Sequence, residues 1–177
     1  MTIDFFKTAA NLKKVKRQGW IDKLSLEHPE SVADHSYSMA IMGMILSDIG
    51  NCDSEKILKM ILLHDLAESE IGDYTPGQIT SEEKRKLEDE TFYKISENLP
   101  ADIKSQYQKI WDEYQENKSY ESKLVHQIDR LEMVLQATIY ENDGHSKENL
   151  SSFIESAKQD ITNPKLKELF RKILENN

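Results

Sequence analysis

The stretch Lys59-Met60-Ile61-Leu62-Leu63-His64-Asp65-Leu66-Ala67-Glu68-Ser69-Glu70-Ile71-Gly72-Asp73 begins as an apolar helix and ends in acids gathered around one histidine. A carboxylate that faces a protein core must be paired or must bind a cation, because burying a bare charge costs more than a helical turn returns. Glu68, Glu70 and Asp73 add three carboxylates within nine residues of His64. This density of acids beside an imidazole predicts a divalent cation site whose other ligands come from elsewhere in the chain.

The overall composition is that of a globular protein in a reducing compartment. The chain has 177 residues, which suits a single domain over residues 1–177 with a sizeable core. No apolar run approaches the roughly 20 residues that a membrane helix needs, and the N-terminus lacks the apolar region of a signal peptide. Cys52 is the only cysteine, so we expect no disulfide framework and a cytoplasmic location.

The net charge limits the class of ligand. A formal charge of −9 argues against a nucleic-acid polymer as partner, because binding one needs an extended basic surface. A small phosphorylated ligand is still compatible with an acidic chain, since it needs only a metal and one or two well-placed cations.

The pattern of apolar residues predicts an all-α protein. Apolar residues recur at i, i+3 and i+4 almost throughout, and the chain has only 6 glycines and 4 prolines. Helices are expected at about residues 4–16, 32–49, 54–70, 81–98, 102–116, 119–142, 147–159 and 164–175. Gly19 is expected to stop the first helix, and Ser31 to cap the second. The helix at 32–49 is apolar nearly all round, which is typical of a central helix.

Three side chains of the opening stretch fall on one helix edge. His64 and Glu68 are four residues apart, and Asp65 and Glu68 are three apart, so all three are neighbours on the helix surface. The alternative is a packed core histidine with two solvated acids. The apolar turns before His64 disfavour that alternative, because they place the helix against the core, where acids are not solvated.

His35 and Asp129 are the candidates for the missing ligands. Asp129 lies in the apolar run 124–135 and needs a cationic partner, which is a metal, a histidine of another helix or a basic side chain. Two histidines and two aspartates make a mixed nitrogen and oxygen site that suits Mn²⁺, Co²⁺, Fe²⁺, Zn²⁺ or Mg²⁺. Of the other histidines, His28, His126 and His145, none is expected to be a ligand, and His28 is the most plausible to line a pocket.

With these residues assembled, the order H…HD…D on helices resembles the HD-domain phosphohydrolase superfamily. Four groups of residues resemble, more narrowly, the HD domain-containing 5′-deoxynucleotidase family and its branch called HD domain-containing protein 2: Leu12 to Trp20, Pro29 to Tyr37, His64 to Glu68 with Ile71-Gly72-Asp73 and Thr75-Pro76, and Gln127 to Ala137. The resemblance covers essentially the whole chain. Lys16 and Gln18 depart from the family's proline and threonine, which leaves the shape of that loop and the base preference open.

The resemblance implies a homodimeric, all-α enzyme that hydrolyses deoxyribonucleoside 5′-monophosphates to the nucleoside and phosphate. It implies His35, His64, Asp65 and Asp129 as metal ligands. It also implies Glu68 and Asp73 as catalytic residues or, with the Tyr74 backbone carbonyl, as ligands of a second metal.

The substrate-binding residues are expected to be Arg17, which matches a phosphate-contacting arginine, Trp20 and Glu30. The structural alternatives are a solvated helix end for Arg17 and a core position for Trp20. Two other functions stay open: another nucleotide phosphohydrolase or phosphodiesterase of the same superfamily, and a catalytically weak helical module that binds a nucleotide.

Overall fold

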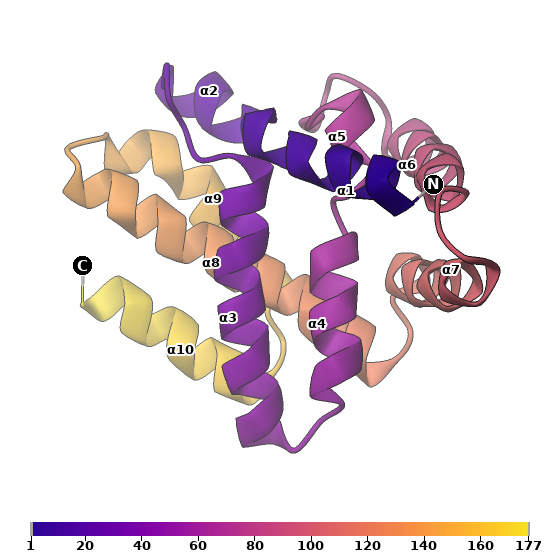
Figure 1. Cartoon of the computed structure of the whole chain (residues 1–177). Coiled ribbons are helices and arrows are strands. Elements are labelled where there is room, and N and C mark those ends of the chain that lie inside the picture. Colours follow the sequence, from indigo (N-terminus) through magenta and orange to yellow (C-terminus); the bar gives the residue numbers. More distant parts are fainter. Residues whose placement is uncertain (1, 177) are drawn as a thin grey trace.

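The computed structural model describes residues 2–176, and within that range the regular secondary structure is helical, with two isolated β-bridges in the connections. The predicted all-α fold is confirmed. The elements, labelled in Figure 1, are α1 (Thr2–Asn11), the 3₁₀ turn η1 (Leu12–Lys14), α2 (Gln18–Leu24), α3 (Val32–Gly50), α4 (Ser54–Leu63), α5 (Glu68–Ile71), α6 (Ser81–Ser96), α7 (Ala101–Glu116), α8 (Tyr120–Asn142), α9 (Lys147–Asp160) and α10 (Pro164–Glu175).

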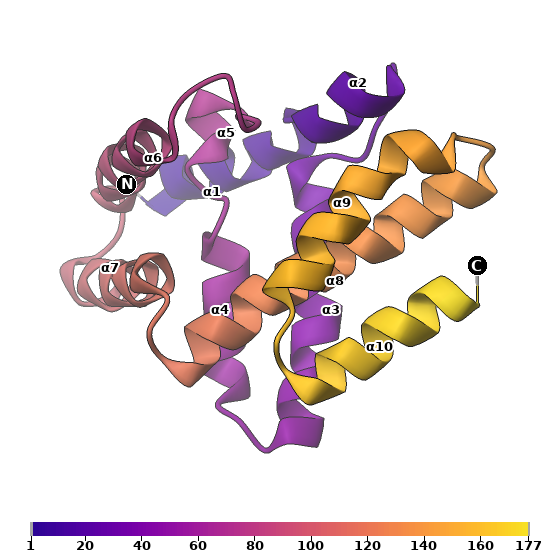
Figure 2. The same cartoon turned by 180° about the vertical axis from the view of Figure 1, so that it is seen from behind.

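Helices α3, α4 and α8 form the centre of the molecule. α3 and α4 lie side by side and α8 crosses both of them (Figures 1 and 2). Gly43 permits the close approach of α3 to α4, because a Cβ atom at this position would collide with the side chain of Ile61. α1 and α2 lie across one end of α3 and α4, while α6 and α7 lie beyond α4.

One continuous cluster of buried apolar side chains extends from Phe5 to Leu166. Among the described residues, the histidines and acids buried with this cluster are His35, His64, Glu68 and Glu132, each at most 5% exposed. Ionisable groups are rarely buried without a partner or a ligand. These four side chains therefore indicate where a functional site lies in the fold. No helix in residues 2–176 is long and apolar enough to cross a membrane.

Most helix starts agree with the prediction. Ser31 caps α3 in a reciprocal capping box with Asp34, and Thr80 caps α6 in the same way with Glu83. Asp53 caps α4 through the backbone amide of Lys56.

Two predicted helices are interrupted. The helix expected at 4–16 ends at Lys14, because the next residues leave it to bond the segment before α3: Val32 N donates to Val15 O at 2.9 Å and Arg17 N to Glu30 O at 3.1 Å. Gly19, expected as a stop, therefore lies inside the unpredicted helix α2.

The helix expected to continue to residue 70 also breaks, at His64. α4 ends at Leu63, and the chain makes tight turns, with Leu66 N donating to Leu63 O and Glu68 N to Asp65 O, both at 3.0 Å. This break changes the directions of His64, Asp65 and Glu68 relative to a straight helix.

Candidate metal centre and its cavity

Three helices bring the predicted ligands together. His35 lies in the first turn of α3, His64 directly follows α4, and Asp129 lies in the middle of α8. One ligand atom from each of these residues falls within 4.8 Å of the others. The fourth predicted ligand, Asp65, lies beside them, with its Oδ2 3.1 Å from His64 Nε2. We call these four residues the metal centre.

The backbone fixes the tautomer of His64. Its Nδ1 lies 2.6 Å from the carbonyl oxygen of Ile61, which can only accept a hydrogen bond, so Nδ1 carries the proton. Nε2 of the neutral ring then presents a lone pair toward Asp65 and the cavity. This is the arrangement that a metal-binding histidine needs.

Glu132 holds His35 in the corresponding way. His35 Nδ1 donates to Glu132 Oε2 at 2.6 Å, and both side chains are buried. His35 Nε2 therefore faces Asp129, whose Oδ1 lies at 3.3 Å. A carboxylate behind the histidine fixes the ring and raises its basicity as a ligand.

Four buried polar atoms at this position lack a hydrogen-bond partner: Nε2 of His35, Nε2 of His64, Oδ2 of Asp65 and Oε2 of Glu68. Unpartnered buried groups carry a free-energy penalty of about 1–3 kcal/mol each, more when charged. The two imidazole nitrogens and Asp65 Oδ2 lie at the metal centre and fit a divalent cation, which would satisfy them, whereas Glu68 Oε2 belongs to the neighbouring group of oxygens described below.

The charges at the metal centre also fit a cation. Burial and the charge of Arg17 lower the pKa of His35, but the carboxylates of Asp129 and Glu132 on either side of the ring outweigh both and raise that pKa to about 10. Burial raises the pKa of Asp65 and of Asp129, but the imidazoles and Arg17 hold both well below the usual range. The protein's own groups thus favour a positive charge among ionised aspartates, and a metal ion meets the same requirement.

A second group of oxygens lies next to the metal centre. Glu68 is 2% exposed, and burial, with the negative charges of Asp65 and Asp73, raises its pKa well above the usual value. Asp73 Oδ2 accepts the backbone amide of Gln18 at 2.9 Å. The Tyr74 carbonyl oxygen accepts a hydrogen bond from Lys84 Nζ at 3.1 Å.

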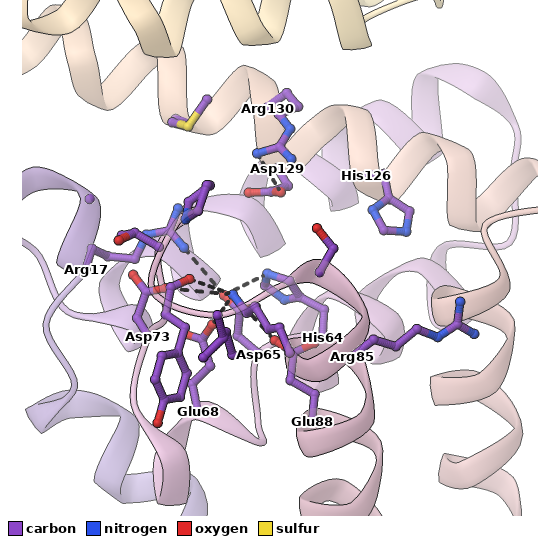
Figure 3. A pocket seen from close by; sticks show the side chains of 18 of the residues that line it. Arg17, His64, Asp65, Glu68, Asp73, Arg85, Glu88, His126, Asp129 and Arg130 are labelled. Carbon is purple, nitrogen blue, oxygen red and sulfur yellow. Dashed lines mark hydrogen bonds and ion pairs between the residues drawn. The ribbon is translucent and has the colours of Figure 1, made fainter.

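The metal centre opens into a cavity of about 510 Å³, which suits a small organic ligand. Its walls include His64, Asp65, Glu68, Asp73 and Asp129, together with Arg17, Trp20, Lys84, Arg85, Glu88, His126 and Arg130. In Figure 3, Asp129 lies between Arg17 on one side of the view and Arg85 on the other. The cavity is thus lined by both carboxylates and guanidinium groups.

The three predicted substrate-binding residues contact one another. Trp20 Nε1 donates to Glu30 Oε1 at 2.8 Å, and Arg17 Nε lies 4.0 Å from the same oxygen. Arg17 and Trp20 line the cavity, whereas Glu30 supports them from behind and is not part of its wall. Burial, with the charge of Glu132, raises the pKa of Glu30 to about 7. Trp20 also occupies a core position, which was the structural alternative for this residue, since it is 1% exposed.

Three residues of the site were not identified from the sequence. Glu132 lies three residues after Asp129 in the same apolar run, so an acid among apolar residues was the available signal. His126 lines the cavity and stacks on Tyr114 at 4.1 Å, although a solvated position was expected. The contacts of Lys84 depend on how α6 folds back onto α5, which no local pattern shows.

Two expectations about the remaining acids and histidines have different outcomes. Glu70 lies outside the cavity and pairs with Lys94 at 3.0 Å, so it does not join the other acids of its stretch at the site. The expectation that His28 lines a pocket is wrong. Its side chain is 84% exposed, because it precedes Pro29 in a connection that runs over the surface.

Comparison with known proteins is consistent with this geometry. A sequence model described as "HD domain" matches residues 9–170. A relative from Dictyostelium discoideum named 5′-deoxynucleotidase HDDC2 is 41% identical, over 94% of this chain and 93% of its own length. A human relative of the same name is 35% identical, over 94% of this chain and 81% of its own length.

Solved structures give the same result for the fold. A protein from Pyrococcus horikoshii superposes with a TM-score of 0.81 and 32% identity, covering 97% of each chain. A conserved hypothetical protein from Pyrococcus furiosus superposes with a TM-score of 0.80 and 30% identity, covering 98% of this chain and 99% of its own.

Proposed function

Because the chain belongs to the HD-domain family, we propose that its cavity is the active site of a metal-dependent 5′-deoxynucleotidase. The enzyme hydrolyses deoxyribonucleoside 5′-monophosphates to the deoxyribonucleoside and phosphate. One observation carries this proposal: the unpartnered Nε2 atoms of His35 and His64 converge with Asp129 beside a cavity that is lined by Arg17 and Glu68. The match over residues 9–170 supports a single HD domain formed by the whole chain, residues 1–177.

The metal centre holds the catalytic cation through His35, His64, Asp65 and Asp129. A divalent cation bound there, with Mn²⁺, Co²⁺, Fe²⁺, Zn²⁺ or Mg²⁺ as candidates, would neutralise charge on the phosphoryl group and lower the pKa of water at the site. A cation that accepts six ligands, such as Mn²⁺ or Mg²⁺, would keep positions for substrate beside these four residues.

The substrate phosphate binds against Arg17. This guanidinium lines the cavity and its Nη1 lies 3.6 Å from Asp65 Oδ2, so it lies at the edge of the metal centre. Glu30 orients it from behind. A guanidinium presents two parallel donors to a phosphate, which a lysine does not.

Glu68 and Asp73 move the protons. Glu68, which is buried and lines the cavity beside Asp65, would take the proton of the water that attacks phosphorus. As the bond from phosphorus to the 5′ oxygen breaks, that oxygen needs a proton. Asp73, oriented by the Gln18 amide at 2.9 Å, would pass on to this oxygen the proton that Glu68 has removed from the water, so that the protons balance. Trp20 walls the nucleoside side of the cavity.

The test is a substrate panel. Protein stripped of metal and reloaded with Mn²⁺ or Co²⁺ is mixed with deoxyribonucleoside and ribonucleoside 5′-monophosphates, a cyclic nucleotide and a phosphodiester, and both the release of phosphate and the loss of each substrate are measured. Release from the deoxyribonucleoside monophosphates is expected. Turnover of the cyclic nucleotide or the diester alone would identify another phosphohydrolase of the superfamily. The absence of any turnover, at high protein concentration and with every metal, would leave only a nucleotide-binding module.

The proposed enzyme is a cytoplasmic homodimer. Five apolar side chains of α3 are 40–70% exposed: Tyr37, Ile41, Met44, Ile45 and Ile49. Four of them recur at the i, i+4, i+7, i+8 spacing of one helix face, and exposed apolar patches of this kind mark interfaces. Light scattering of the purified chain is expected to give twice the mass of 20.6 kDa, and Ile45→Glu to give the monomer. A monomeric wild-type protein would contradict this proposal.

A further inference from the structure

Lys84 lies in the middle of the oxygens next to the metal centre. Its Nζ lies 3.1 Å from the Tyr74 carbonyl oxygen, 3.4 Å from Glu68 Oε1, 3.5 Å from Glu88 Oε1 and 4.0 Å from Asp73 Oδ1. We call the four residues around Lys84, namely Glu68, Asp73, Tyr74 and Glu88, the second carboxylate cluster. The ammonium therefore occupies a position that is surrounded by oxygen atoms on several sides, as a bound cation would be.

The helix itself does not favour a positive charge at this position. Lys84 is the fourth residue of α6, whose N-cap is Thr80, and the first turn of a helix carries partial positive charge from its unsatisfied amides. The other ionisable residues of this turn, Glu82 and Glu83, have the sign that the helix favours. The acids that surround Lys84 in space, rather than its helix, account for its presence there.

We propose that Lys84 is the resident cation of the second carboxylate cluster, and that a second divalent ion binds this cluster only in competition with the Lys84 ammonium. The inference rests on the proposed metal centre, because it concerns what binds next to it. A second cation must use Glu68, Asp73 and the Tyr74 carbonyl, which are the groups that Lys84 contacts.

Competition follows from charge and from geometry. Two cations that share the same oxygens at 3–4 Å repel each other strongly, and partial burial reduces the screening by water. Lys84 can leave, because its side chain is 30% exposed and has a flexible stem. Glu68 Oε2 is buried and unpartnered, so the cluster keeps an acceptor that the lysine does not satisfy. A second ion therefore binds, but more weakly than it would without the lysine.

The test counts Mn²⁺ ions. Free Mn²⁺ is measured by electron paramagnetic resonance during titration of the wild type, of Lys84→Met, which keeps a long stem and removes the charge, and of Lys84→Arg, which keeps the charge. The matched control is Lys94→Met, a lysine of the same helix that pairs with Glu70 outside the cavity at 3.0 Å.

One tightly bound Mn²⁺ is expected in the wild type, in Lys84→Arg and in Lys94→Met. In these three proteins the second Mn²⁺ is expected to have a dissociation constant at least about tenfold higher than the first. Lys84→Met is expected to bind the second ion about tenfold more tightly than the wild type, with the first ion unchanged. Lys84→Gln should shift the second ion in the same direction, so a folding defect of one variant cannot imitate the result.

The outcomes separate this inference from the proposed function. A second ion that binds Lys84→Met no more tightly than the wild type overturns the role of Lys84 and leaves the metal centre intact. The absence of any tightly bound ion from all the proteins overturns the metal centre, and this inference falls with it.

Discussion

The metal centre and the second carboxylate cluster lie next to each other in one cavity, yet they satisfy their charges in different ways. The metal centre draws its groups from α3, the end of α4 and α8, and its histidines are held from behind by Glu132 and by the Ile61 carbonyl. The second carboxylate cluster comes from α5, the loop after it and α6, and it contains its own cation, Lys84.

The difference lies in the donor atoms. An imidazole lone pair that points into a buried site requires a proton or a metal. At His64 the one proton of the neutral ring is on Nδ1, where it is donated to the Ile61 carbonyl oxygen, so Nε2 has none. Carboxylate and carbonyl oxygens accept an ammonium as readily as a metal ion. The metal centre therefore requires a metal ion, whereas the second carboxylate cluster can hold either an ammonium or a metal ion. The following substitutions test this difference.

Asp129→Ala is expected to have the largest effect, because it removes a ligand from the metal centre and the carboxylate that faces His35 Nε2. Bound metal, measured by elemental analysis, should fall to near zero and kcat/KM by about a thousandfold or more, equivalent to about 4 kcal/mol of transition-state stabilisation. Asp112→Ala is the matched control, since Asp112 accepts a hydrogen bond from Tyr93 at 2.6 Å and does not line the cavity. Full metal content in Asp129→Ala would contradict the site.

Glu68→Gln should separate catalysis from metal binding. The amide keeps the shape of the side chain but cannot take a proton, so kcat is expected to fall by about 10²–10⁴-fold while one metal ion stays bound. Glu70→Gln, two residues away and outside the cavity, should behave as the wild type. Loss of the first metal ion together with activity would instead make Glu68 a ligand of the metal centre.

Glu132→Gln tests the support behind His35. The weaker hydrogen bond should lower the affinity for the first metal ion by about 10–100-fold, measured by competition with a chelator, because the ring loses basicity and orientation. Activity should return at high metal concentration. An unchanged affinity would show that Glu132 only fills a buried position.

Arg17→Lys should have the smallest effect of the four. The charge is kept but the paired donors are lost, so KM for the monophosphate is expected to rise about tenfold with metal content unchanged. Arg171→Lys, on the exposed face of α10, serves as the control. A fall in kcat with KM unchanged would place Arg17 at the transition state rather than in substrate binding.

The contrast between the two sites also explains what the sequence made predictable. His35, His64-Asp65 and Asp129 stand out because each is a polar residue beside apolar turns, and the 3.6-residue period places them on helices that converge. The break at His64 and the extra helix α2 were not predictable, because they depend on hydrogen bonds between residues 15–17 and 30–32 and on turns that form only in the folded chain. Lys84 was hidden for a similar reason: its contacts cross from α6 to α5 and the loop that follows α5.

The central claim is that the first metal ion lies between His35 Nε2, His64 Nε2 and Asp129. A second set of ligand atoms, from Glu30, His35 and Glu132, lies on the other side of the His35 ring and offers a competing site. Anomalous diffraction from crystals grown with a low Mn²⁺ concentration distinguishes the two. The account predicts one strong peak, coordinated by both Nε2 atoms and Asp129. A peak between Glu30 and Glu132, on the Nδ1 side of His35, would contradict it.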